Sequence, residues 1–238
     1  MIGCTSQMGK YKVRYIYHPS EFENCQNGEK CILVKGDYTL KKSIQLLNKR
    51  DVVFDASLST IKMAANAPVR NGYSLINMRD CNQLSFKGFI LDGNRDARGC
   101  EENYAHSVIM VNCSQIQISN TTIRNSVVDG ILIGAGTEGD TSTYCRDISI
   151  ENVKIESSCR NGISIINAFG VKLKQLQISN SNGLSPAAGI DVESDLNLPT
   201  PSNKNIVITD CQITDNKGCG IMTSQKEVLK TSRLLITL

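Results

Sequence analysis

Residues 148–155 read ISIENVKI and place apolar side chains at the first, third, sixth and eighth positions. The same spacing returns in copies that begin at Leu84, Ile116, Val171 and Ile206. With the copy at Ile148, successive starts lie 32, 32, 23 and 35 residues apart. Because these apolar residues alternate with polar ones and recur at a similar period, they predict short strands in stacked, similar units.

A second recurrence, of Gly followed by Ile, runs out of phase with the first. It begins at Gly130, Gly162, Gly189 and Gly220. Each unit therefore has a strand at Gly-Ile, a bend, a second strand, a turn and a third strand, and the turn carries Asn120, Asn152 or Asp210. Such units cannot close a core alone, but stacked at ~4.8 Å per coil they pair in parallel. The pattern predicts an all-β fold, a single-stranded parallel β-helix with three short strands per coil.

The pattern also divides the chain. Residues 1–31 are expected to form an irregular lead-in segment, and residues 32–238 the β-helix domain, with 32–66 as atypical coils that cap one end. The spacing of Leu229, Thr231, Leu234 and Ile236 predicts that the last coil is incomplete. We therefore expect a shortened version of a longer protein.

Composition excludes some classes of function. The formal net charge is +3 and the basic residues are spread along the chain, so no nucleic-acid footprint is predicted. No apolar run approaches the ~18 residues of a membrane-spanning helix. The sequence MIGCTSQ shows no export signal, but it resembles the end of a bacterial lipoprotein box in which Cys4 would carry the lipid.

Ten cysteines are present, and their spacing separates two groups. Cys81, Cys113 and Cys145 lie 32 residues apart, which predicts a stacked column of buried free thiols. Cys25 and Cys31 bracket a polar loop and could form a disulfide if the protein is exported. We expect an extracytoplasmic protein, either secreted, periplasmic or a surface lipoprotein.

The repeat, the Asn-rich turns and the phrases FILDGNR and GIDVESD resemble the right-handed parallel β-helix proteins of the pectin-lyase-like superfamily. The resemblance covers residues 32 to about 224. It implies a carbohydrate-directed protein, since polygalacturonases, pectate and alginate lyases and phage tailspike depolymerases share this scaffold. The expected partner is a polysaccharide or oligosaccharide, and the expected state is a monomer.

Three long insertions, residues 92–104, 134–147 and 194–205, adjoin the Gly-Ile strands and should crowd one face. Asp191 and Glu193 point outward there, about 7 Å apart by strand rise. They could bind Ca²⁺ or act as acid and base on a glycosidic bond. Alternatively, they are solvated residues paired with Arg160.

Asp129 and His106 are the remaining candidates. Asp129, in SVVDGI, resembles the Asn-Thr-Asp-Gly segment of polygalacturonases, but Arg160-Asn161 and Ala187-Ala188 replace that family's next motifs. The polygalacturonase catalytic set is therefore absent, and Asp129 could simply cap a turn. His106 could be a base held by Asp129, or a surface histidine. Arg160 could neutralise a uronate carboxylate or take the proton beside it.

The sequence leaves two classes of function open. One is a polysaccharide lyase or glycoside hydrolase acting on an acidic glycan, with catalytic candidates Asp129, Arg160, Asp191, Glu193 and His106. The other is a non-catalytic glycan-binding or surface β-helix, which could be a truncated relative of such an enzyme. Residues 92–95, Asp-Gly-Asn-Arg, are expected to form a tight turn in which Gly93 supplies a positive φ.

Overall fold

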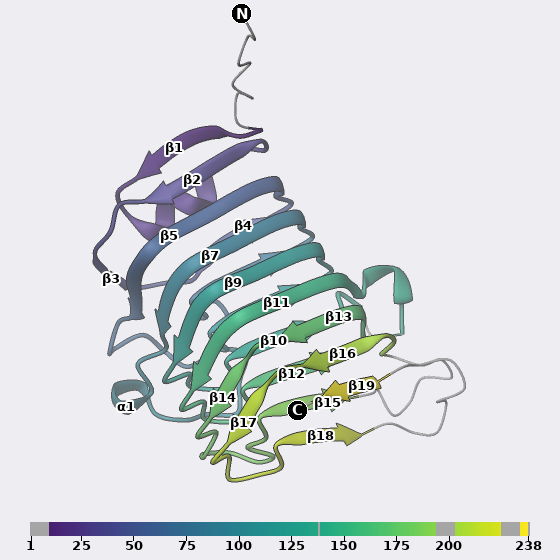
Figure 1. Ribbon diagram of the computed structural model, residues 1–238. Helices are drawn as coiled ribbons and strands as arrows, with labels where there is room; N and C mark the ends of the chain where they lie inside the picture. The colour runs from purple at the N-terminus through teal and green to yellow at the C-terminus, as the bar shows by residue number, and fades with distance from the viewer. Residues whose placement is uncertain (1–9, 138, 194–202, 225–233, 238) are drawn as a thin grey trace, which may run out of the picture.

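The computed structural model of the chain describes residues 10–137, 139–193, 203–224 and 234–237. The chain winds in successive coils along one axis, from the N-terminal strands to the C-terminal ones (Figure 1). Every pair of neighbouring strands in its sheets is parallel, one coil apart. The structure confirms the predicted parallel β-helix. No helix among the described residues is long and apolar enough to span a membrane.

Two parallel sheets form the sides of the β-helix in the described part of the chain. The twelve-stranded sheet contains β1 (Lys12–Ile16), β2 (Glu29–Leu33), β5 (Arg50–Met63), β7 (Asn82–Asp92), β9 (Ser114–Arg124), β11 (Cys145–Glu156), β13 (Ala168–Lys174), β16 (Ile206–Thr209) and β19 (Leu234–Thr237), flanked by β3 (Asp37–Leu40), β14 (Gln177–Ser179) and β17 (Gln212–Thr214). The seven-stranded sheet contains β4 (Ile44–Leu47), β6 (Ile76–Arg79), β8 (Val108–Val111), β10 (Ile131–Gly134), β12 (Ile163–Ile166), β15 (Ile190–Glu193) and β18 (Ile221–Ser224).

The long strands bend where the sequence predicts turns. Asn120 and Asn152 have φ of 49° and 52°, in the left-handed region, and Asn152 Nδ2 donates to Asn120 Oδ1 at 2.6 Å. Asparagine tolerates this conformation, and its side chain stacks on the asparagine at the equivalent position of the next coil. Each bend divides a long strand into two straight segments, and in later coils the segments separate into β13 and β14.

The inward residues of both sheets form one continuous core. Ile148, Ile150, Val153 and Ile155 are all buried, as the register of residues 148–155 predicts. The aligned thiols of Cys81, Cys113 and Cys145 are also buried and free, which confirms the predicted column. Burial of such aligned apolar side chains supplies the main driving force for stacking.

The N-terminal end differs from the expected irregular lead-in. β1 pairs with β2, so the parallel ladder already begins at Lys12. The 3₁₀ helix η1 (Pro19–Asn24) follows β1, and its Phe22 packs on Phe54 with ring centroids 5.4 Å apart. The end of the core is thus covered by a segment before residue 32. The alternation in β1 is hard to recognise because Val13 and Tyr15 are exposed.

Two further expectations concern this end and the opposite one. Cys25 and Cys31 form a disulfide, as the sequence allowed. At the C-terminal end, Leu234 aligns with Ile206, which begins a repeat, whereas the apolar spacing placed Leu229 there. That register is therefore wrong by five residues. Leu229 and Thr231 themselves lie outside the described residues.

Candidate functional site

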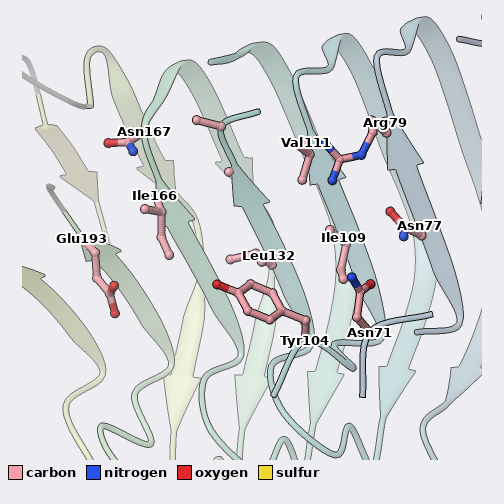
Figure 2. Close-up of a pocket in the computed structure, with 12 residues that line it drawn as sticks. Asn71, Asn77, Arg79, Tyr104, Ile109, Val111, Leu132, Ile166, Asn167 and Glu193 are labelled. Carbon is pink, nitrogen blue, oxygen red and sulfur yellow. The ribbon is translucent and has the colours of Figure 1, made fainter. Parts of the chain in front are cut away.

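A groove of about 530 Å³ crosses the outer face of the seven-stranded sheet (Figure 2). Its floor is built from two ladders, meaning rows of outward side chains aligned from coil to coil. The inner ladder contributes Asn77, Ile109 and Leu132. The outer ladder contributes Arg79, Val111, Gly134, Ile166 and Glu193.

Loops form the two walls of the groove. Tyr104 and Asn71 lie on one side and Asn167 on the other (Figure 2), and Ala135, next to Gly134, also lines the groove. Tyr104 belongs to the insertion 92–104, which contains helix α1 (Arg95–Arg98), and Ala135 to the insertion 134–147, which contains the 3₁₀ helix η2 (Thr141–Thr143). These two insertions therefore flank one face, as predicted. Most of the third insertion lies outside the described residues.

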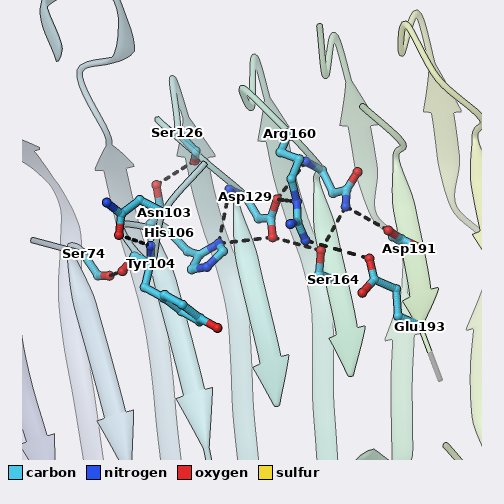
Figure 3. A network of polar contacts seen from close by, with 12 residues as sticks. Ser74, Asn103, Tyr104, His106, Ser126, Asp129, Arg160, Ser164, Asp191 and Glu193 are labelled. Carbon is cyan, nitrogen blue, oxygen red and sulfur yellow. Dashed lines mark hydrogen bonds and ion pairs between the residues drawn. The ribbon is translucent and has the colours of Figure 1, made fainter. Parts of the chain in front are cut away.

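Asp129 is the centre of a polar network beside the groove (Figure 3). Its side chain is 0% exposed. Arg160 Nε donates to Asp129 Oδ1 at 3.0 Å, and the Asn161 backbone N–H donates to the same oxygen at 2.9 Å. Ser164 Oγ donates to Oδ2 at 2.9 Å, and His106 Nδ1 lies 3.1 Å from Oδ2. All these contacts favour the ionised carboxylate.

The pKa of Asp129 lies below its ordinary value. Burial by itself would raise that pKa, but the hydrogen bond from His106 and the charges of His106 and Arg160 outweigh it. His106 Nδ1 lies 3.1 Å from Asp129 Oδ2 and 3.3 Å from the Asp129 backbone nitrogen, so the ring contacts both the side chain and the backbone of Asp129. Asp129 is thus a buried anion that holds Arg160 and His106 in place.

Asn161 and Ser164 connect Asp129 to Asp191. Asn161 Nδ2 lies 3.1 Å from both Ser164 Oγ and Asp191 Oδ2, and Asn161 Oδ1 accepts the Ala188 backbone N–H at 2.9 Å. Neither Asn161 nor Ser164 was among the sequence-based candidates. Asn161 precedes a Gly-Ile pair, as Asp129 does, so its position in the repeat was the available signal.

Asp191 and Glu193 point outward from β15, as predicted, but their environments differ. Asp191 is 0% exposed, whereas the Glu193 side chain is 33% exposed at the end of the groove. Burial, followed by the hydrogen bond and charge of Glu193, raises the pKa of Asp191 to about 7. Asp191 Oδ1 accepts no hydrogen bond from the described residues, so this buried oxygen is free to carry a proton.

Arg160 joins the two halves of the network. Its Nη2 lies 3.9 Å from Glu193 Oε1, while its Nε binds Asp129. The structure therefore brings His106, Asp129, Arg160, Asp191 and Glu193 into one connected cluster. Only Arg160 and Glu193, with side chains 19% and 33% exposed, are open enough to meet a ligand. His106 is buried rather than on the surface, because Tyr104 packs edge-on against its ring.

Comparison with known families decides the classification. The family described as "Right handed beta helix region" matches residues 106–236, more than half of the chain. The chain belongs to this right-handed β-helix family. The match contains all five sequence-based candidates, and it confirms the handedness that the resemblance implied. A comparison with curated proteins found no match.

Solved structures share the fold of this β-helix protein at low identity. A protein of Geobacillus virus E2, ORF18, is 13% identical with a TM-score of 0.57, over 78% of this chain and 34% of its own. The Agl-KA catalytic domain is 12% identical with a TM-score of 0.51, over 88% and 40%. The Streptococcus pneumoniae surface protein and adhesin PfbA is 11% identical with a TM-score of 0.51, over 95% and 78%. The chain thus spans well under half of the first two structures.

The described residues of this β-helix protein do not complete a calcium site at Asp191 and Glu193. Calcium takes six to eight oxygen ligands. Here Asp191 Oδ2 already accepts from Asn161, and the cationic Arg160 lies beside Glu193. Among the described residues, three metal-ligating side chains converge only at Cys25, Glu29 and Cys31, where the two cysteines form a disulfide.

The Asp-Gly-Asn-Arg segment is a structural turn, with a correction to the role of its glycine. Asn94, not Gly93, has the positive φ, at 59°. Gly93 is required because an added Cβ would lie 2.5 Å from the Asn125 carbonyl oxygen. Asp92 Oδ2 accepts from Arg124 Nε at 3.0 Å, so this carboxylate holds neighbouring coils together.

Proposed function

We propose that this chain is a carbohydrate-active β-helix protein that processes an acidic glycan in the groove, as a polysaccharide lyase or a glycoside hydrolase. One observation carries the proposal. Glu193 faces the groove, and directly behind it Asp191 has a pKa of about 7. Two neighbouring carboxyl groups in different environments can serve as acid and base near neutral pH.

Both reactions need a group that accepts a proton and a group that donates one. Hydrolysis needs a proton for the departing glycosidic oxygen and a base for the attacking water. β-Elimination needs a base for the proton beside the uronate carboxyl group and, again, a proton for the departing oxygen. Glu193 is the group that meets the glycan as acid or base, and the buried Asp191 beside it acts on Glu193 as a neighbouring titratable group. Arg160 orients Glu193 and attracts the uronate carboxylate.

Asp129 and His106 take a supporting part in this proposal. Both are buried, and both act through Arg160, whose guanidinium they hold at Asp129. We therefore assign them as positioning residues instead of groups that touch the glycan. Replacing either is expected to disturb Arg160 first.

The test is turnover of pectic, alginate and host-type glycans, with and without Ca²⁺. Absorbance from unsaturated products reports a lyase, and new reducing ends without such absorbance report a hydrolase. We expect Glu193→Gln to lower the rate about 100-fold or more, in line with the loss of one acid or base group. The matched control is Glu151→Gln, an exposed carboxylate on the other sheet that pairs with Lys174 at 2.9 Å.

A non-catalytic glycan-binding protein is the second candidate. It is favoured by the replacement of the polygalacturonase motifs at Arg160-Asn161 and Ala187-Ala188, and the fold is shared by an adhesin as well as by a catalytic domain. Saturable glycan binding by folded protein, with no product from any glycan, would decide for this candidate and against the enzyme.

We also propose an extracytoplasmic location. Two disulfides, Cys25–Cys31 and Cys100–Cys159, lie within the described residues, and such bonds persist in oxidising compartments. Alkylation of the freshly isolated native protein before and after reduction should reveal four additional thiols.

A further inference from the structure

The charged side chains of the groove lie at its two ends. Arg79 lies at one end and Glu193 at the other, on the same outer ladder (Figure 2). Four coil steps separate them, from β6 through β8, β10 and β12 to β15. At ~4.8 Å per step, the two ends are about 19 Å apart.

The floor between these ends carries no charge. It consists of Ile109, Val111, Leu132 and Ile166, with Gly134 leaving a gap in the outer ladder. Tyr104, which is 65% exposed, adds an aromatic surface to the wall. Apolar and aromatic surface suits the C–H faces of neutral sugars, whereas a carboxylate held against it would lose hydration without gaining a partner.

Arg79 is an unused cation. It is exposed, and its guanidinium makes no hydrogen bond or ion pair with any residue that the structure describes. Asn167, at the wall, is buried and lines the groove, and its Oδ1 also lacks a partner in that part of the chain. The groove therefore offers an anion-binding group at one end and an unsatisfied amide near the other.

We infer that the groove selects a glycan whose acidic units are separated by neutral ones. One acidic unit binds Arg79, the intervening units place fewer carboxylates over the apolar floor than a homopolyuronate would, and the reacting bond lies at Glu193. This inference rests on the proposed carbohydrate function and deepens it. A homopolyuronate is disfavoured because it would place a carboxylate over every part of the uncharged floor.

Gly134 provides a way to block the floor without disturbing the coil. An added Cβ there would meet only the Ile166 carbonyl oxygen, at 3.9 Å, which is an ordinary contact. The side chain of Gly134→Val would therefore project into the groove. It leaves Arg79 and the network around Asp129 unchanged.

The experiment measures dissociation constants by calorimetry for three hexasaccharides. They are oligogalacturonate, charged on every unit, a hyaluronan fragment, charged on alternate units, and neutral chito-oligosaccharide. The native chain should bind the alternating glycan most tightly. Arg79→Gln should weaken that binding about tenfold or more, the loss of a charge-assisted contact, and leave the neutral glycan unchanged. Gly134→Val should weaken all three.

The matched control is Arg50→Gln, which removes an exposed cation of β5, outside the groove. Melting curves verify that each variant folds. Tightest binding of the oligogalacturonate, or equal effects of Arg79→Gln on charged and neutral glycans, would overturn the inference. So would unchanged binding by folded Gly134→Val. Binding as expected without turnover would refute only the proposed enzymatic activity. Turnover of a glycan whose binding Arg79→Gln leaves unchanged would refute only this inference.

Discussion

At the scale of single residues, Asp129 and Asp191 show how neighbours decide the state of a buried carboxyl group. Both are 0% exposed. Asp129 is surrounded by donors and cations and has a lowered pKa, whereas Asp191 faces a second carboxylate and has a pKa of about 7. Burial by itself raises the pKa of both groups, so the lowered pKa of Asp129 follows from its partners.

Asp191→Asn should make the protein more stable in alkaline solution. The folded-state pKa of Asp191 lies above its unfolded value of 3.8, so the native chain loses stability as the pH rises from about 4 to about 7 and stays level above that. Asparagine removes this loss and can still accept from Asn161. We expect the Tm of the variant to exceed the native value by several degrees near pH 8 and to match it near pH 4. Equal Tm differences at both pH values would contradict the assignment.

Asp129→Asn should change the stability in the opposite direction and destabilise the protein. The lowered pKa of Asp129 means that its contribution is fully present above the unfolded value of 3.8 and is lost as the pH falls through its folded pKa. Breaking a buried charge pair costs about 3–5 kcal/mol. Urea unfolding at neutral pH should show a loss of that order, and the loss should shrink in acid. A variant as stable as the native chain would argue against the network around Arg160.

At the scale of elements, the corner before each Gly-Ile strand brings backbones into close contact. A Cβ added at Gly162 would lie 2.5 Å from the Gly189 carbonyl oxygen and from Ile178 Cγ2. The equivalent Cβ at Gly130 would lie 2.5 Å from the Gly162 carbonyl oxygen. The recurrence of glycine thus reflects the lack of space between coils.

Gly162→Ala should therefore destabilise the protein by about 1–3 kcal/mol, the usual cost of overpacking. Gly220→Ala is the matched control, since its Cβ would meet only Ile213 Cγ2, at 3.6 Å. Urea denaturation of the two variants measures the difference. Similar losses at both positions would show that the close approach is not the reason for the glycine.

The two disulfides should also contribute unequally. Cys100–Cys159 closes a loop with a sequence separation of 59 and ties the insertion that carries Tyr104 to the residue before Arg160, whereas Cys25–Cys31 has a separation of 6. Chain-entropy estimates give about 4 kcal/mol for the longer loop and about 2 kcal/mol for the shorter. Urea unfolding of the two paired Cys→Ser variants should reproduce that order. A larger loss from the short loop would contradict it.

At the scale of the whole molecule, the sequence predicts what the repeat controls and little else. Alternation in residues 148–155 specifies which side chains face inward, and so it placed Asp191 and Glu193 on one outer face. It could not show that Asn161 and Ser164 would cover Asp191, or that Tyr104 would cover His106, because those contacts depend on how the corners and insertions fold. Nor could it detect β1, where Val13 and Tyr15 face outward and only Ile16 enters the core.

The alignment of the outer ladder from Arg79 to Glu193 has a consequence for how such a protein can change. Backbone hydrogen bonds between coils hold neighbouring strands at the same interval of ~4.8 Å, whatever side chains the strands carry. Insertions can reshape the walls by any amount, but the floor can lengthen or shorten only by whole coils. The length of the groove floor can therefore change only in steps of one coil. Adapting the groove to a longer or shorter ligand requires the gain or loss of an entire repeat.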